Sequence, residues 1–214
     1  MSAGVPGRVP RLFLLSPAYA GGERAKLLLR EHSQVPLAVQ LRQGRAPLGD
    51  VYAFISELYF RGKVAYSAAF HGPPEGVPGT LVITPGFGLV PADVPLGIDQ
   101  LKAIASVPVD DSNPDFRNSL QRDAQLIWQH AGPQCLFVLL GSIATGKYVT
   151  PLLEVLGENL VFPSDFVGRG DMSRGGLMLR AARSGTELAY ASVGAISRHG
   201  PRPPRLPKLP SRHA

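Results

Sequence analysis

The amino-acid sequence predicts an α/β fold, a single three-layer domain with a largely parallel central sheet. Short apolar runs, typical of strands buried on both faces, occur at residues 11–15, 80–84 and 135–140. Stretches with helical spacing separate these runs, and this alternation is typical of parallel sheets covered by helices. A loop rich in glycine, serine or proline follows each run. We therefore expect one domain over residues 11–193.

The two ends of the chain differ from this domain in composition. Residues 1–10 contain two glycines and two prolines and are predicted to be a flexible leader. Residues 194–214 form a tail rich in proline and arginine, which we expect to be extended or disordered. Its part from residue 198 onward holds five basic and no acidic residues, without which the formal charge of +6 falls to about +1. The tail suits nonspecific attraction to polyanions or, at residues 207–212, a polyproline-binding groove.

Composition excludes several classes of protein. No apolar run in the 214 residues approaches the length needed to span a bilayer, so no membrane association is expected. The apolar run at residues 12–15 is too short for the core of a signal peptide. The single cysteine, Cys135, excludes an intramolecular disulfide, and its apolar surroundings favour a core residue over a reactive thiol. These observations predict a cytoplasmic protein.

The first half of the domain contains two predicted helical regions. A short helix covers residues 24–30, whereas residues 34–47 show no regular pattern. A longer helical region begins at Asp50, a good N-cap, because apolar residues then recur at three- and four-residue intervals. A loop of glycine and proline at residues 72–79 ends this region before the next strand.

The second half of the domain opens with a well-marked helix. Asn113 is a good N-cap, Pro114 suits the first helical position, and Gly132 with Pro133 ends the helix. Alternation of strands and helices then continues to the end of the domain. The remaining expected elements are strands at residues 135–140, 160–162 and 187–193 and helices at residues 149–156 and 177–183.

The loop after the strand at residues 135–140 has the G-x-x-x-x-G-K spacing of a phosphate-binding loop. Backbone N–H groups of such a loop cradle a phosphate, and its lysine supplies a positive charge. Tyr148, however, stands where serine or threonine would bind Mg²⁺. A tight turn that needs glycine only for its geometry is therefore the preferred interpretation. The candidate ligand-binding residues of this loop are Gly141, Ser142, Thr145, Gly146 and Lys147.

A loop of glycine and charged residues at positions 168–176 is the stronger candidate for a binding site. Its arginines and free backbone N–H groups, placed before a predicted helix, suit a phosphate or carboxylate ligand. In an alternative of equal weight, Asp171 only pairs with an arginine and Ser173 only caps the helix. The candidate ligand-binding residues of this loop are Arg169, Asp171, Ser173 and Arg174.

Ligands of open α/β sheets bind at the carboxyl ends of strands, where these loops lie. We therefore expect the loops to meet at one cleft. Tyr59 and Arg61, together with Lys63, either line this cleft or form the solvated end of their helix. The residues expected to converge are Ser16, Gly86, Gly88, Gly141, Ser142 and Arg174.

No set of residues identifies a reaction. The five histidines lack the spacing of metal ligands, so neither a metal site nor a cofactor is predicted. Ser142 has the chemistry of a nucleophile, but the sequence assigns no base to it. The catalytic residues are therefore unknown, and the sequence leaves open whether the protein is an enzyme.

Three segments occur in an order that resembles a known family. They are residues 14–18 (LLSPA), 84–91 (TPGFGLVP) and 173–178 (SRGGLM), with a Leu-Tyr pair at residue 58 before the second. In this order they resemble the YaaA peroxide-stress proteins and a related uncharacterised bacterial family. Tyr19 stands where YaaA proteins have lysine. The resemblance implies an α/β fold distantly like that of uracil-DNA glycosylases, and DNA binding in oxidative-stress defence.

The two candidate binding loops and the resemblance to YaaA proteins together predict a protein that binds nucleic acid or a nucleotide in bacterial stress or DNA-damage physiology. The alternative is an enzyme that acts on a nucleoside or nucleotide, either at the glycosidic bond or at a phosphate. DNA and nucleotides are the expected partners in either case.

Overall fold

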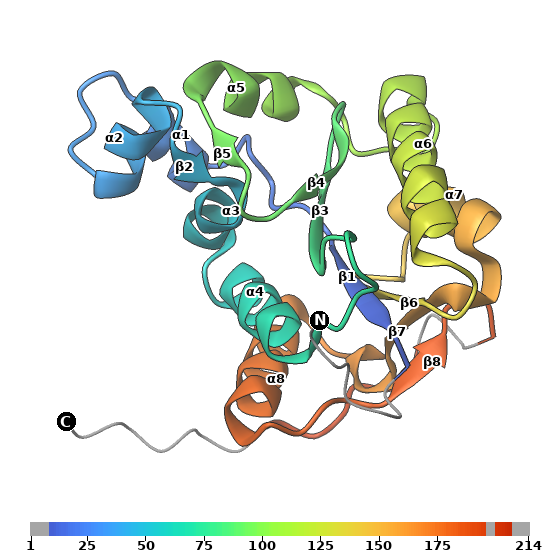
Figure 1. Ribbon diagram of the computed structural model, residues 1–214. Coiled ribbons are helices and arrows are strands. Elements are labelled where there is room, and N and C mark those ends of the chain that lie inside the picture. Colours follow the sequence, from blue (N-terminus) through green and yellow to red (C-terminus); the bar gives the residue numbers. More distant parts are fainter. Residues whose placement is uncertain (1–8, 196–199, 207–214) are drawn as a thin grey trace.

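Six strands form the central sheet in the computed structural model of the chain, which describes residues 9–195 and 200–206 (Figure 1). The strand order is β4-β3-β1-β6-β7-β8. The four inner strands run parallel, and the two edge strands, β4 and β8, pair antiparallel with their neighbours. The prediction of an α/β fold with a largely parallel sheet is therefore confirmed. The strands are β1 (Arg11–Leu15), β3 (Thr80–Thr84), β4 (Gly88–Pro91), β6 (Leu136–Leu140), β7 (Leu160–Pro163) and β8 (Tyr190–Ser192).

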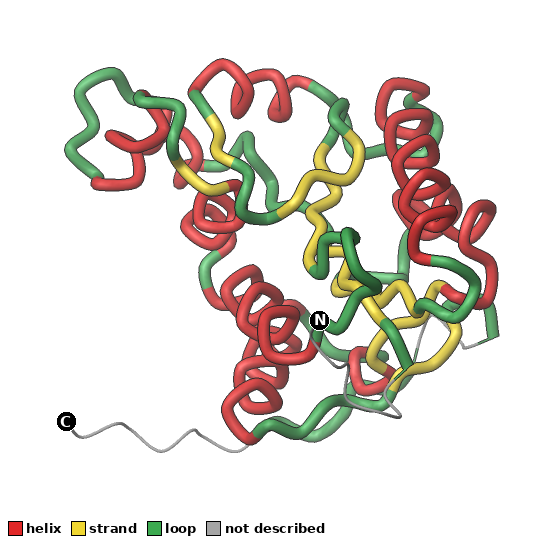
Figure 2. Tube along the Cα trace, in the orientation of Figure 1, coloured by secondary structure: helices red, strands yellow, loops and turns green. Residues whose placement is uncertain are grey.

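Helices cover both faces of this sheet. Figure 1 shows α4 and α8 on one side of the strands and α6 and α7 on the other, and Figure 2 shows the helices outside the strands. A small antiparallel sheet of β2 (Ala46–Pro47) and β5 (Pro95–Leu96) lies beyond the main sheet. The helices are α1 (Glu23–Leu29), α2 (Pro36–Arg42), α3 (Leu48–Ser56), α4 (Leu58–Phe70), α5 (Ile98–Ser106), α6 (Pro114–Ala131), α7 (Gly146–Leu156) and α8 (Asp171–Ser184), with short 3₁₀ turns at Gly157–Asn159 and Ser164–Phe166.

The central strands β1 and β6 hold the first loop of the site in place. All apolar side chains of β1 are fully buried, as expected for a strand covered on both faces. The Ser16 N–H donates to the Leu140 carbonyl at 3.1 Å, so the pairing with β6 continues one residue past β1. Ser16 is thereby fixed at the carboxyl edge of the sheet.

Helices α4 and α8 approach each other through two glycines. A Cβ on Gly62 would lie 2.8 Å from the Gly175 carbonyl oxygen, and a Cβ on Gly175 would lie 2.8 Å from the Leu58 carbonyl oxygen. A side chain at either position would force the two backbones apart. This close contact places the N-terminal turn of α8 against the start of α4.

Several predicted boundaries in the helical regions are wrong. Helix α8 begins at Asp171 rather than at residue 177, because Gly175, one of the glycines that suggested a loop, packs against α4. Helix α3 begins at Leu48, so Asp50 lies in its first turn and is not the N-cap. The chain breaks at Glu57, which has φ of 50°, and the region beyond it is a second helix, α4.

Other segments differ from the predictions because tertiary packing, not local pattern, fixes their structure. Residues 34–47 contain α2 and β2 in place of irregular chain, and α5 was not predicted. The segment at residues 85–91 turns back as β4, so Gly88 belongs to a hairpin with β3. The Asn113 cap is confirmed, since its side chain accepts from the Asp115 N–H at 3.1 Å.

The chain ends are described only in part. The predicted leader lies outside the described residues except for residues 9 and 10, and Arg198, Lys208 and Arg212 of the tail also lie outside them. The described tail segment, residues 200–206, contains no regular secondary structure. Among the described helices, none combines the length and apolar character needed to cross a bilayer.

Candidate functional site

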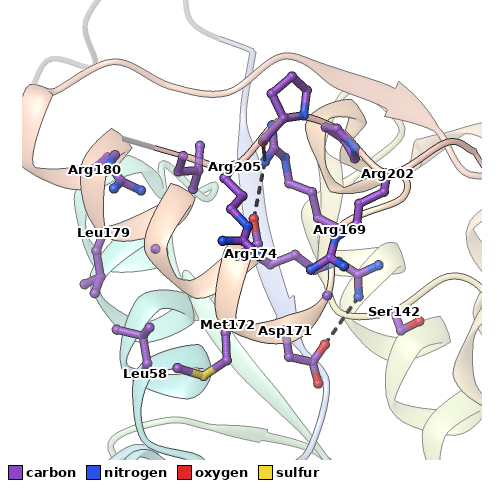
Figure 3. A pocket seen from close by; sticks show the side chains of 16 residues that line it. Leu58, Ser142, Arg169, Asp171, Met172, Arg174, Leu179, Arg180, Arg202 and Arg205 are labelled. Carbon is purple, nitrogen blue, oxygen red and sulfur yellow. Dashed lines mark hydrogen bonds and ion pairs between the residues drawn. The ribbon is translucent and has the colours of Figure 1, made fainter. Parts of the chain in front are cut away.

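An open pocket of about 900 Å³ lies at the N-terminus of α8 (Figure 3). Among the described residues that line it, five are arginines and Asp171 is the one acidic residue. A concave surface with this charge raises the local concentration of anions. We call it the arginine pocket, and its five arginines are Arg169, Arg174, Arg180, Arg202 and Arg205.

Arg169 connects three segments at the pocket. Its Nε donates to the Asp165 carbonyl at 2.9 Å, and its Nη1 donates to Ser173 Oγ and to the Pro204 carbonyl, both at 3.3 Å. The tail backbone also passes against Gly168, where a Cβ would lie 2.2 Å from the Pro201 carbonyl oxygen. Residues 202–206 are therefore a wall of the pocket.

Arg174 is a buried, oriented guanidinium in the first turns of α8. Its Nε and Nη2 donate to the Phe166 carbonyl at 3.3 and 3.2 Å, and only 8% of the residue is exposed. Its Nη1 lies 3.5 Å from Asp171, a long contact to a carboxylate whose side chain is 65% exposed. The Phe166 carbonyl thus fixes the guanidinium plane, and an anion can replace Asp171 at Nη1.

Apolar side chains line the pocket beside the arginines. Leu58 comes from α4, and Met172 and Leu179 come from α8; Met172 is 68% exposed. Figure 3 shows Arg180 near Leu179 at one end and Asp171 with Ser142 at the other. The pocket therefore offers charged groups for an anion and apolar contacts for the organic part of the same ligand.

The residues that we call the buried polar cluster lie at the end of the pocket near Ser142. They are Ser16, Tyr59 and Lys63, which are buried, and Tyr148, which is half-buried. Lys63 is 1% exposed, and its Nζ lies 2.9 Å from the Ser16 carbonyl oxygen and 2.7 Å from Ser16 Oγ. The ring centroid of Tyr59 lies 4.1 Å from the same Nζ. Among the described residues, no carboxylate forms an ion pair with Lys63.

Burial determines the protonation of this lysine. It lowers the pKa of Lys63 to about 7; the charge of Asp171 raises this pKa and that of Arg174 lowers it further. At neutral pH a large fraction of Lys63 is therefore the uncharged amine. An uncharged amine can accept the Ser16 hydroxyl proton while it donates to the Ser16 carbonyl.

Two tyrosines complete the buried cluster. Burial raises the pKa of Tyr59, an effect that Arg174 opposes, and its hydroxyl has no hydrogen-bond partner among the described residues. Burial also raises the pKa of Tyr148, and hydrogen bonding with Ser16 opposes this rise. A Cβ on Gly141 would lie 2.7 Å from Ser16 Cβ, so Gly141 leaves the space that Ser16 occupies.

The structure brings part of the predicted cleft together. Arg169, Asp171, Ser173, Arg174 and Ser142 line the pocket, and Ser16, Tyr59 and Gly141 lie in or against the buried polar cluster next to it. Six predicted residues belong neither to the described lining of the pocket nor to the buried polar cluster. These are Arg61, Gly86, Gly88, Thr145, Gly146 and Lys147.

The residues outside the pocket have other neighbours. Gly88 lies in the β3–β4 hairpin against Asp123, whose Oδ2 accepts from the Leu89 N–H at 2.9 Å. Arg61 lines a separate, smaller pocket with Asp50 and Glu57.

The glycine loop before α7 faces acidic residues. A Cβ on Gly146 would lie 3.3 Å from Asp111 Oδ2, and Lys147 is exposed. Hydrogen bonds from Ser112 lower the pKa of Asp110, and the positive charge of Lys147 contributes. The carboxylates of Asp110 and Asp111 thus lie near the place where a phosphate-binding loop would hold its anion.

Sequence reasoning placed Lys63 either at the cleft or at the solvated end of its helix and predicted neither its burial nor its contact with Ser16, and it gave Tyr148 no role in the site. Lys63 repeats with Tyr59, Phe60, Tyr66 and Phe70 at helical intervals, and all five are buried. A lysine on the buried face of a helix, without an acidic residue one turn away, is the pattern that would have identified it.

Among the described residues, no three histidine, cysteine, aspartate or glutamate side chains gather where they could hold a metal ion. Comparisons of the chain with family models, with curated proteins and with solved structures gave no match. The function is therefore inferred from the geometry of the site.

Proposed function

We propose that the protein binds the phosphate of a nucleotide or of a nucleic acid in the arginine pocket. The observation that carries this proposal is the charge of the described lining, five arginines against one aspartate. Arginine guanidinium groups bind phosphate oxygens in bidentate geometry, and Arg174 is already oriented by Phe166.

The apolar residues beside the arginines favour a nucleotide over inorganic phosphate. Leu58, Met172 and Leu179 offer a surface on which a base or sugar can pack. A pocket of about 900 Å³ also falls in the size range of small-molecule sites. A role in stress or DNA-damage physiology is an additional proposal, and it rests on the resemblance to YaaA proteins alone.

Calorimetric titration with a nucleoside, its monophosphate and triphosphate, and a short single-stranded oligonucleotide tests the proposal. We expect no heat from the nucleoside and saturable binding of the phosphorylated ligands that weakens as salt increases. Equal affinity for the nucleoside and its monophosphate would contradict a phosphate site. Binding of the oligonucleotide but of neither nucleotide would assign the pocket to nucleic acid.

Arg24→Ala is the control for substitutions of the pocket arginines in this titration. Like Arg174, Arg24 is an arginine on a helix, but it lies outside the described lining of the pocket. It should leave nucleotide affinity unchanged.

The alternative function, an enzyme that acts on a nucleotide, is favoured by one specific observation. A serine hydroxyl lies 2.7 Å from a buried lysine amine next to the pocket. A serine and a lysine in this arrangement can act as a nucleophile and its general base.

A further inference from the structure

We propose that Ser16 is a nucleophile, that Lys63 is its general base, and that the two residues cleave a phosphate ester bound in the arginine pocket. This inference rests on the proposed function for its substrate class. It adds a covalent reaction to a site that otherwise only binds.

The pair has the geometry that an activated serine requires. Ser16 Oγ lies 2.7 Å from Lys63 Nζ, within the range for direct proton transfer, and the Ser16 carbonyl holds the same Nζ at 2.9 Å. The carbonyl can only accept a hydrogen bond, so Nζ donates to it and directs its lone pair elsewhere. Among the described residues, Ser16 Oγ is the second hydrogen-bond partner of Nζ.

Burial without a counter-ion is the second observation. A buried lysine normally pairs with a carboxylate, because an isolated buried charge is costly. Lys63 is 1% exposed and forms no ion pair with a described carboxylate. Perturbed ionisable groups of this kind occur preferentially at functional sites.

The groups around Lys63 agree with an uncharged amine. Tyr59 lies on its own helix, Ser16 follows β1, Tyr148 lies on α7, and Asp171 and Arg174 lie on α8. The charges of Asp171 and Arg174 act on Lys63 in opposite directions, and burial dominates. Tyr148 lies next to Ser16, which lowers the pKa of the tyrosine against the effect of burial.

The reaction balances with water as the only co-reactant. Lys63 Nζ takes the Ser16 hydroxyl proton while Oγ forms a bond to phosphorus and the bond from phosphorus to the leaving oxygen breaks. The Lys63 ammonium then gives its proton to the leaving oxygen. Water attacks the phosphoserine with Lys63 again as base, and Ser16 Oγ leaves with a proton. The arginines stabilise the added negative charge at phosphorus in both steps.

Access to Ser16 requires a local opening, because only 3% of the residue is exposed in this structure. Movements of this kind at loops and helix ends accompany ligand binding in many enzymes. The Ser142 edge of the pocket is the nearest route, since Gly141 beside it contacts Ser16.

The test uses a fluorophosphonate probe and the p-nitrophenyl ester of thymidylate as substrate, with p-nitrophenyl acetate in parallel. We expect the probe to phosphonylate Ser16, located by peptide mass spectrometry. We also expect Ser16→Ala and Lys63→Met each to lower turnover of the phosphate ester by about a hundredfold or more. With wild-type protein the rate should rise about tenfold between pH 6 and pH 8, as Lys63 loses its proton.

Ser106→Ala and Lys102→Met, two exposed positions on α5, are controls and should retain full turnover. Ser16→Ala removes only one hydroxyl, so it keeps the test valid if Lys63→Met does not fold. Labelling at another serine, turnover that survives in Ser16→Ala, or hydrolysis of the acetate alone would overturn the inference. Nucleotide binding without any turnover or labelling would also overturn it and leave the proposed function standing, whereas absence of binding would refute the proposed function itself.

Discussion

The loops before α7 and before α8 differ in what surrounds them. The first, residues 141–147, has the formal spacing of a phosphate-binding loop, but acidic side chains face its glycine and lysine. The second, residues 167–170, has no such spacing, yet arginines from the loop, the helix and the tail meet there. Helix N-termini attract anions in both places.

From this difference we infer that a sequence motif specifies the backbone of a loop, whereas the neighbouring side chains determine whether an anion can bind there. At α7 the connection between α5 and α6 supplies two aspartates, which already face the positive end of the helix. At α8 the tail supplies two arginines, which add to the field of the helix instead of neutralising it. Only tertiary structure brings either set of charges into place.

The largest expected effect concerns the glycines of the two regions. In Gly175→Ala a Cβ would meet the α4 backbone at 2.8–3.0 Å, so the helices must separate. We expect a loss of about 2–3 kcal/mol of unfolding free energy. In Gly146→Ala the closest atom is the side-chain oxygen of Thr150, which can rotate away, and the change should stay within about 1 kcal/mol. Urea unfolding of both variants measures this, and equal losses would contradict the close contact of α4 and α8.

A second expected effect, on the pH dependence of stability, distinguishes Lys63 next to the pocket from Lys147 in the loop before α7. The lowered pKa of Lys63 means that the unfolded chain binds more protons above pH 7, so stability must rise with pH there. With a folded pKa of about 7 and an unfolded pKa near 10.5, the expected gain is about 2 kcal/mol between pH 7 and pH 9. Lys63→Met should lose this gain, whereas Lys147→Met should keep it. Unfolding curves at four pH values measure the difference, and parallel pH profiles for wild type and Lys63→Met would exclude a neutral buried lysine.

The sequence predicts the main sheet well because its strands are buried on both faces. The apolar runs at Arg11–Leu15 and Thr80–Thr84 can be recognised as strands from the sequence alone, and the structure has both strands with these bounds. The start of α8 was missed because glycines at 175 and 176 disfavour a helix locally, and the fit against α4 overrides that preference.

Of the candidate site, sequence reasoning placed single residues and not their partners. Arg169 and Arg174 were identified from their own loop, but the tail arginines that join them are about 30 positions away in the sequence. The Ser16–Lys63 contact joins residues 47 positions apart, through β1 and α4, and no local pattern reports such a contact.

Arg174→Ala should produce the largest loss of ligand binding. The variant removes a guanidinium oriented by the Phe166 carbonyl, and a hydrogen bond to a charged group contributes about 1.5–3 kcal/mol. Nucleotide affinity should therefore fall at least about tenfold, and Arg174→Lys should recover only part of it, because an ammonium cannot bind in bidentate geometry. Calorimetric titration measures both variants. Full affinity in Arg174→Ala would show that the ligand does not bind at the α8 loop.

Truncation of the tail at two points gives a smaller effect. A chain that ends at Leu206 keeps the described wall of the pocket, so it should bind nucleotides with affinity within about twofold of wild type. Because this chain lacks Lys208 and Arg212, the slope of log affinity for DNA against log salt concentration should become less steep by about two units. A chain that ends at Gly200 also loses Arg202 and Arg205, and nucleotide affinity should fall by about fivefold or more. Filter binding over a salt series distinguishes the two. Equal nucleotide affinities would show that the tail arginines do not reach the ligand.

The smallest effect is expected at the loop that matches the motif. Lys147→Ala removes the lysine that a phosphate-binding loop would use, but Lys147 is exposed and acts on Asp110. An exposed pair of this kind contributes little, so nucleotide affinity should change less than about twofold at physiological salt. Asp111→Asn is the complementary variant, because it removes a carboxylate near Gly146. If that negative charge alone prevented phosphate binding at the α7 loop, this variant would bind a second nucleotide. Calorimetric titration should show one nucleotide per chain in both variants. A second bound nucleotide in Asp111→Asn, or lost binding in Lys147→Ala, would mean that the spacing of the α7 loop outweighs its neighbours, contrary to the comparison of the two loops.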